Sequence, residues 1–143
     1  MSSLMNRLSL QSLLAAEAGI AADKLGITIP PGVDELAVLI CLQSSVEVGA
    51  DPVTASPVDG SNYFTFAFYE GEASNGSDAV LVPSDRQSAT VVFNDVAMVG
   101  YHQKIVVRIG PASYLFLGYA ATGIPDGTFS VAAITTTGAH LPA

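Results

Sequence analysis

Residues 63–70 read YFTFAFYE, and this short stretch constrains the fold more than any other part of the chain. Phe64, Phe66 and Phe68 occupy every second position. Side chains of a β-strand alternate between its two faces, whereas a helix repeats every 3.6 residues. A strand over 63–70 therefore carries three phenylalanines on one face. That face requires a second layer to cover it, which indicates two packed sheets.

Further strands are expected on both sides of this one, separated by stretches rich in Gly, Pro, Asn, Asp and Ser. About eight strands at short spacing predict an all-β fold, an antiparallel β-sandwich or jelly roll. We expect a core that includes Leu39, Phe64, Phe66, Phe68, Val107 and Val131. The other expected strands cover residues 25–29, 35–43, 79–83, 88–93, 101–109, 113–119 and 128–136.

The first 24 residues differ from the rest, so we divide the chain into an N-terminal arm or helix, 1–24, and a β-sandwich domain, 25–143. Residues 4–18 fit either a short amphipathic helix or an extended arm. Burying a leucine is worth roughly 1.5–3 kcal/mol, so the segment is expected to pack on its own sandwich or on a partner. We favour the partner, and expect its interface leucines to be Leu4, Leu8, Leu10, Leu13 and Leu14.

The charge of the chain argues against nucleic-acid binding, and the length of its apolar stretches argues against a membrane span. Its formal net charge is −8, and only 13% of its residues are charged. A negative field repels phosphate backbones, so direct nucleic-acid binding is not expected. No stretch approaches the roughly 18 apolar residues of a transmembrane helix, so no membrane span is expected.

Residues capable of catalysis or metal binding are few. His102 and His140 are the only histidines, and Cys41 lies in the apolar stretch ELAVLICLQ, where a buried thiol is expected. The acids of residues 49–87 match no twelve-residue calcium loop. We therefore expect no enzyme activity, no cofactor and no metal site.

Residues 99–110, VGYHQKIVVRIG, place two of the five basic residues on one strand. Lys104, Val106 and Arg108 are expected on one face, and Ile105, Val107 and Ile109 on the other. The first face is interpreted as a solvated strand face with acids on neighbouring strands. Alternatively, Arg108 pairs with a carboxylate of a neighbouring subunit. Lys104 and Arg108 are for that reason included among the candidate interface residues.

Several stretches resemble a family of small virion proteins of tailed bacteriophages, which are thought to decorate or cement the capsid. In VGYHQKIVVRIG, the matching residues are Gly100, Tyr101, Lys104, Val107 and Arg108. The resemblance covers about three quarters of the chain, from Leu25 to the C-terminus. Its other parts are GVDELAVLICL, VDGSNYFTFAFYE, GEASNGSDAVLVP and DGTFSVAAITTTGAHLP.

The resemblance implies a structural β-sandwich protein on the outer surface of a phage capsid, made in the host cytoplasm. Its implied partners are the major capsid protein and further copies of itself, with a trimer favoured. The alternative is a carbohydrate-binding β-sandwich on a virion or cell surface, for which Tyr63, Tyr69, Tyr114 and Tyr119 are the available aromatics. A tail or baseplate component is a third hypothesis.

Overall fold

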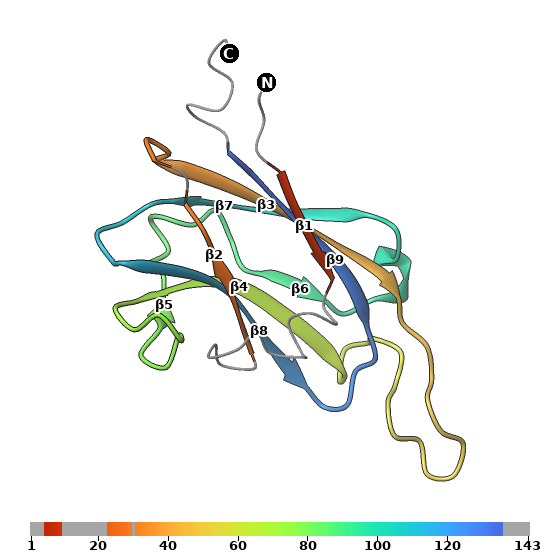
Figure 1. The fold of residues 1–143 in the computed structure, drawn as a ribbon. Helices are drawn as coiled ribbons and strands as arrows, with labels where there is room; N and C mark the ends of the chain where they lie inside the picture. The colour runs from red at the N-terminus through yellow and green to blue at the C-terminus, as the bar shows by residue number, and fades with distance from the viewer. Residues whose placement is uncertain (1–4, 10–22, 30, 136–143) are drawn as a thin grey trace.

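The computed structural model describes residues 5–9, 23–29 and 31–135. Within them, nine strands form two antiparallel sheets that pack face to face (Figure 1). This confirms the expected all-β sandwich. The structure also describes a 3₁₀ turn at Val96–Met98.

The first sheet has four strands in the order β1-β9-β3-β7. The second has the order β2-β8-β4-β5, with β6 also paired to β4. Strands of the first sheet are β1 (Met5–Ser9), β3 (Glu35–Ser44), β7 (His102–Arg108) and β9 (Thr128–Thr135). Those of the second are β2 (Lys24–Ile27), β4 (Tyr63–Gly71), β5 (Val80–Leu81), β6 (Val91–Phe93) and β8 (Tyr114–Thr122).

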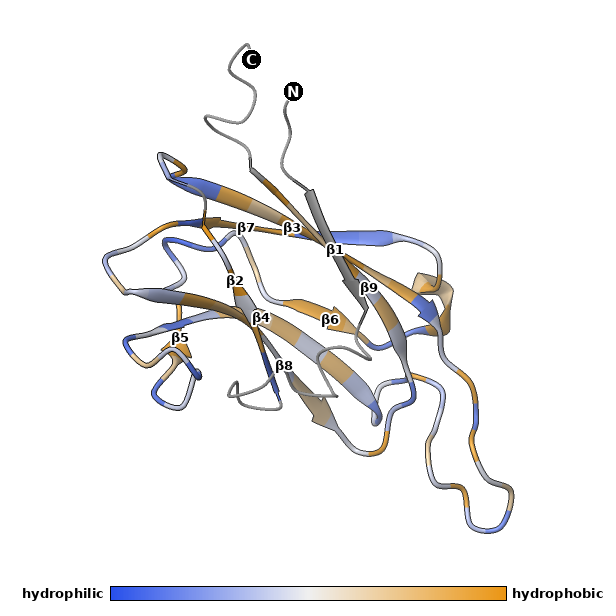
Figure 2. Cartoon of the chain, viewed as in Figure 1, coloured by the Kyte–Doolittle hydropathy of each residue, from blue (hydrophilic) through white to orange (hydrophobic). Residues whose placement is uncertain are grey.

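The core lies between the two sheets, and the phenylalanine stripe of β4 is its centre. Phe66 and Phe68 have no exposed surface and Phe64 is buried. Phe66 meets Phe93 edge to face at 5.8 Å between ring centroids, and Phe64 meets Phe129 at 5.1 Å. Edge-to-face packing suits the quadrupole of aromatic rings. Figure 2 shows the hydrophobic bands on the strands that line this core.

The prediction that Leu39 belongs to the core is wrong. It is only half-buried, whereas Val38 and Ile40 on either side of it are fully buried. Strand β3 is apolar on both faces, from Leu36 to Leu42, so alternation does not tell which face is inside. The inner set is Leu36, Val38, Ile40 and Leu42. The expected core residues Val107 and Val131 are buried.

Of the two forms expected for the N-terminal segment, the extended one holds for Met5–Ser9. These residues form β1, an edge strand that pairs antiparallel with β9, and Leu8 lies opposite Val131 in the register. This part of the expected arm thus pairs with its own chain. Leu4, Leu10, Leu13 and Leu14 lie outside the described residues.

Candidate functional site

Strand β7 carries the basic residues of interest at one edge of the first sheet. As expected, Ile105 and Val107 are fully buried and Lys104 and Arg108 are exposed. The register with β3 places Glu35 opposite Arg108 and Leu39 opposite Lys104. The acid expected across the strand therefore exists for Arg108, while Lys104 faces an apolar residue.

The edge of β7 that faces away from β3 is covered by residues 86–88. The Arg108 N–H donates to the carbonyl of Arg86 at 2.7 Å, and the Ser88 N–H donates to the carbonyl of Val106 at 2.8 Å. The hydroxyl of Ser88 accepts from the Val106 N–H at 3.0 Å. These contacts pair the backbone groups that an open strand edge would present to another chain.

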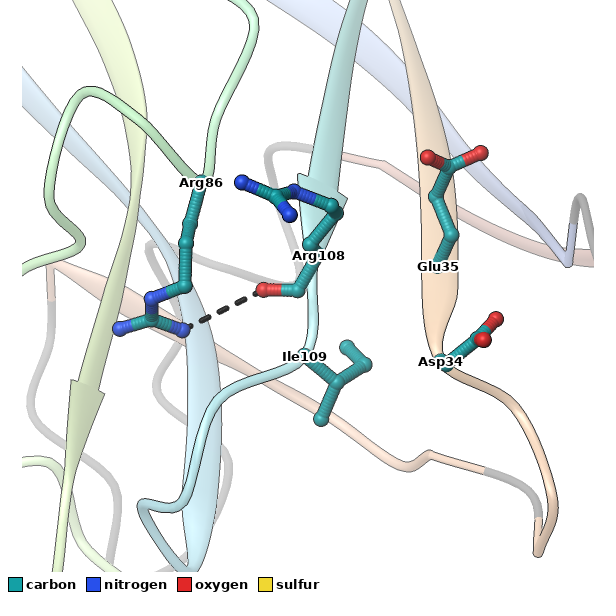
Figure 3. Close-up of a pocket in the computed structure, with 5 residues that line it drawn as sticks. All are labelled: Asp34, Glu35, Arg86, Arg108 and Ile109. Carbon is teal, nitrogen blue, oxygen red and sulfur yellow. Dashed lines mark hydrogen bonds between the residues drawn. The ribbon is translucent and has the colours of Figure 1, made fainter.

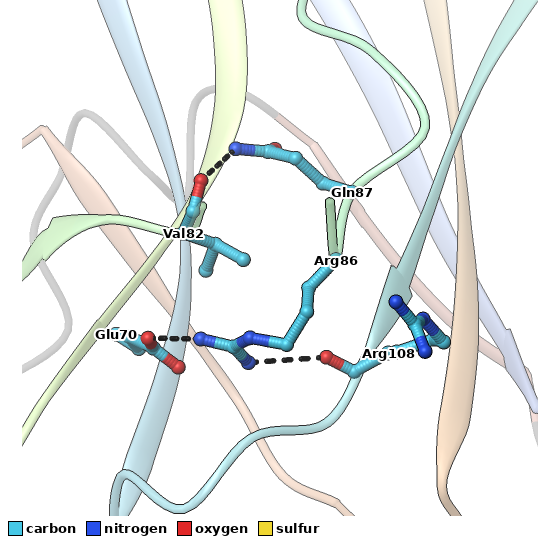
Figure 4. A network of polar contacts seen from close by, with 5 residues as sticks. All are labelled: Glu70, Val82, Arg86, Gln87 and Arg108. Atoms are coloured by element: carbon cyan, nitrogen blue, oxygen red, sulfur yellow. Dashed lines mark hydrogen bonds and ion pairs between the residues drawn. The ribbon is translucent and has the colours of Figure 1, made fainter. Parts of the chain in front are cut away.

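The side chain of Gln87 points from this covering segment into the core. Among the residues that the structure describes, Gln87 is the one polar residue that is buried. Its amide oxygen accepts from the Phe68 N–H at 3.0 Å, and its amide nitrogen donates to the Val82 carbonyl at 2.7 Å. Figure 4 shows the second of these bonds. Because a buried amide without partners is costly, this double pairing stabilises the contact between segment 82–88 and β4.

Arg86 extends the network toward the surface. Its guanidinium forms an ion pair with Glu70 and donates to the carbonyl of Arg108 at 3.3 Å (Figure 4). Both side chains of the pair are mostly buried, at 18% and 15% exposure. The guanidinium lies so close to Gly110 that a β-carbon there would overlap it. Arg86 is therefore a structural cation that joins β4 to the end of β7.

A pocket of about 350 Å³ opens beside this network and is shown in Figure 3. Its lining has two guanidinium groups and two carboxylates: Asp34, Glu35, Arg86 and Arg108, with Ile109. The Nη2 of Arg108 donates to the backbone carbonyl of Asp85 at 2.6 Å. The mixed charges give the pocket no strong preference for an anion or a cation. A smaller hollow of about 200 Å³ adjoins it on the Ser88 side.

Two of the acids within residues 49–87, Asp59 and Asp78, accept hydrogen bonds from backbone N–H groups in turns. Asp59 accepts from the N–H groups of Ser61 and Asn62, both at 2.8 Å, as expected for an Asp–Gly turn. These bonds lower the pKa of the Asp59 carboxyl. Asp78 accepts in the same way from the N–H groups of Glu72 and Ala73. In the described part of the chain, no three His, Cys, Asp or Glu side chains gather as a metal-binding group.

The four tyrosines considered for sugar binding have different surroundings. Tyr119 packs against the core, and burial together with the nearby Asp23 raises the pKa of its phenol. Tyr69 lies beneath the ammonium of Lys24, 4.7 Å from its ring centroid. Tyr114 is 43% exposed and lines a pocket of about 250 Å³ with Ser113 and the stretch 27–29. Tyr63, at the start of β4, is half-buried.

The cysteine and the two histidines lie at separate places in the chain. Cys41 is buried, as expected, and His102 is exposed. His140 lies outside the described residues. Arg86 and Gln87 were missed by the sequence reasoning, because a single arginine or glutamine in a turn-rich stretch has no pattern that marks it.

Among the described residues, no helix is long and apolar enough to cross a membrane. Comparison with known proteins finds no matching family model, no similar curated protein and no similar solved structure.

Proposed function

We propose that the chain is a structural protein of a tailed-phage virion, a decoration or cement subunit that binds the outer surface of the capsid. The proposal rests on the resemblance of its sequence motifs to such proteins. The observation that supports it best is the position of the motif residues on β7 and the turn before it. Val107 is in the core, whereas Tyr101, Lys104 and Arg108 are exposed.

Exposed residues in a shared motif suit a surface that contacts another protein better than they suit a core. Tyr101 is 67% exposed, and tyrosine and arginine are frequent anchors of protein interfaces. In this proposal the subunit adds buried area at joints between capsid proteins. Binding to the assembled lattice then stabilises the particle by mass action. No catalytic step and no cofactor are part of the proposed role.

The experiment requires heads assembled from a major capsid protein of the phage that the proposal assigns to this chain. The purified protein is mixed with undecorated heads and sedimented, and the heads are then heated with and without it. We expect saturable cosedimentation and a higher temperature of disruption. Tyr101→Ala should weaken binding, and Val92→Ala, another exposed apolar position, serves as the matched control. Absence of cosedimentation at all concentrations would falsify the proposal.

A carbohydrate-binding module is the second candidate, and the pocket beside Tyr114 is the observation in its favour. An exposed aromatic ring beside the Ser113 hydroxyl is a combination that sugar sites use. The Ser113 hydroxyl donates to a Glu72 carboxylate oxygen at 2.6 Å, which adds an acceptor nearby. A glycan array discriminates the two roles, since a cement protein binds nothing on it.

A tail or baseplate subunit differs from the main proposal in its place on the particle, which a particle reconstruction decides.

A further inference from the structure

One end of the sandwich is built from three loops, which join β3 to β4, β6 to β7 and β8 to β9: residues 45–62, 94–101 and 123–127. The strand pairing brings these loops to the same end. Ser44 at the end of β3 lies opposite Thr128 at the start of β9, and the ends of β6 and β8 lie beside the start of β4. Figure 1 shows the longest loop projecting beyond the strands there. We name the three loops the loop end.

Hydrogen bonds hold the loop end in place. The Val46 N–H donates to the Asp126 carboxylate at 2.9 Å. The Ser56 N–H donates to the Ile124 carbonyl at 2.8 Å, which joins the first loop to the third a second time. The N–H of Gly100, in the loop before β7, donates to a carbonyl of β3. A surface held in this way loses little chain entropy when it contacts another molecule.

The loop end carries most of the exposed apolar surface of the described chain. Ten large hydrophobic residues are exposed in the part that the structure describes, and six of them lie in these three loops. The six are Val46, Val48, Val53, Val96, Tyr101 and Ile124. Single exposed hydrophobic residues need no explanation, but a concentration of them at one end of a molecule indicates an interaction surface.

The charged side chains of the loop end are all negative. Its acids are Glu47, Asp51, Asp59, Asp95 and Asp126, and none of the five basic residues of the chain lies in the three loops. Asp59, Asp95 and Asp126 accept hydrogen bonds from backbone N–H groups of the loops themselves. Glu47 and Asp51 are exposed, and the ion pairs found among the described residues include neither of them. A partner's cations can therefore reach these two carboxylates.

The combination of apolar surface and negative charge selects the class of partner. Nucleic acids and membranes that contain anionic lipids are themselves negative, so the carboxylates repel them. We propose that the loop end docks a positively charged protein segment in which lysines or arginines are interspersed with apolar residues. Glu47 and Asp51 meet the cations of that segment, and the valines cover its apolar side chains. This contact goes beyond the proposed function, in which Tyr101 alone of these loops takes part.

The test needs no capsid and uses a defined probe. The isotope-labelled full chain is titrated with a synthetic peptide in which lysines alternate with leucines, and NMR amide shifts map the contact and give the dissociation constant. One comparison peptide carries serines in place of the leucines, and another carries glutamates in place of the lysines. We expect the lysine–leucine peptide to shift the amide signals of the loop end. It should bind at least about tenfold more tightly than either comparison peptide.

A charge reversal tests the two exposed carboxylates. Glu47→Lys with Asp51→Lys should weaken binding of the lysine–leucine peptide at least about tenfold, because like charges then face each other. The matched control is Glu72→Lys with Asp85→Lys, which changes the net charge equally. These are exposed acids beside the opposite ends of the strands, after β4 and beside the end of β7. The control should bind within about twofold of the wild type.

A second pair of variants tests the apolar part of the contact. Val48→Ser with Val53→Ser should weaken binding about fivefold, because apolar area is then lost from the contact. Its control is Val80→Ser with Leu81→Ser, which are 64% and 51% exposed beside the far end of β4 and should leave binding unchanged. All the substituted residues are exposed, so circular dichroism should match the wild type.

Three results would overturn the inference: amide shifts spread evenly over the sandwich, loop-end variants that bind like the wild type, or no peptide binding at any concentration. Broadening of the loop-end signals with protein concentration alone would assign this surface to a second copy of the chain and overturn the inference as well. Head binding, measured separately, bears on the proposed function alone, so the two ideas fail independently.

Discussion

The side-chain amide of Gln87 accepts a hydrogen bond from the backbone N–H of Phe68 at 3.0 Å, in the interior of the sandwich. Through the same amide, Gln87 also donates to the Val82 carbonyl at 2.7 Å. A residue from the segment that covers the edge of β7 thus completes the backbone hydrogen bonding of β4 in the other sheet. The two sheets are joined here by a polar contact in addition to apolar packing.

Gln87→Leu removes both hydrogen bonds while keeping a similar volume. The Phe68 N–H and the Val82 carbonyl are then buried without these partners, at about 1–3 kcal/mol each. We expect a loss of roughly 2–6 kcal/mol in the free energy of unfolding, measured by denaturant titration. Gln43→Leu, at an exposed position of β3, is the control and should change stability little. Equal effects of both substitutions would contradict the role assigned to Gln87.

Phe66→Ala tests the aromatic core. Its ring has no exposed surface and contacts Phe93 and Phe129 edge to face. We expect a loss of about 3–5 kcal/mol in the free energy of unfolding. Leu39→Ala is the comparison, and it should cost less than about 2 kcal/mol because Leu39 is half-buried on the outer face. The idea of an inward phenylalanine stripe fails if Phe66→Ala costs less than about 1 kcal/mol.

Gly118→Ala tests a close approach on the outer face of the second sheet. A β-carbon at this position would lie 2.5 Å from the Tyr69 ring, which itself lies beneath Lys24. The ring must move, and overpacking of this kind costs about 1–3 kcal/mol. Gly60→Ala is the control, since a β-carbon there has nothing within 4 Å. Thermal melting should separate the two variants, and a Gly118→Ala protein as stable as the control would contradict this packing.

Asp59→Ala tests the turn before β4 through its pH dependence. Hydrogen bonds from the Ser61 and Asn62 N–H groups lower the pKa of the Asp59 carboxyl in the folded protein. A lowered folded pKa contributes stability that is present above the unfolded pKa and is lost as pH falls through the folded pKa. The stability gap between wild type and variant should therefore be widest near neutral pH and shrink in acid. Denaturant melts at a series of pH values measure it, and a constant gap would show that the carboxylate charge is not involved.

The strand positions could be predicted from the sequence because hydrophobic alternation and turn residues are local signals. The stretch YFTFAFYE became β4 with its phenylalanines inside. In VGYHQKIVVRIG, the alternation placed Ile105 and Val107 inward and Lys104 and Arg108 outward. For β3 the same rule failed at Leu39, because apolar residues on both faces remove the contrast on which it depends.

What the sequence by itself determined is therefore the class of fold, the approximate strands and the inner face wherever one face is polar. Only the tertiary structure decided which distant residues meet. Glu35 lies opposite Arg108, Arg86 pairs with Glu70, and Gln87 reaches Phe68. Such contacts depend on strand order and register, which are set by the packing of the whole sandwich rather than by the neighbours of each residue in the chain.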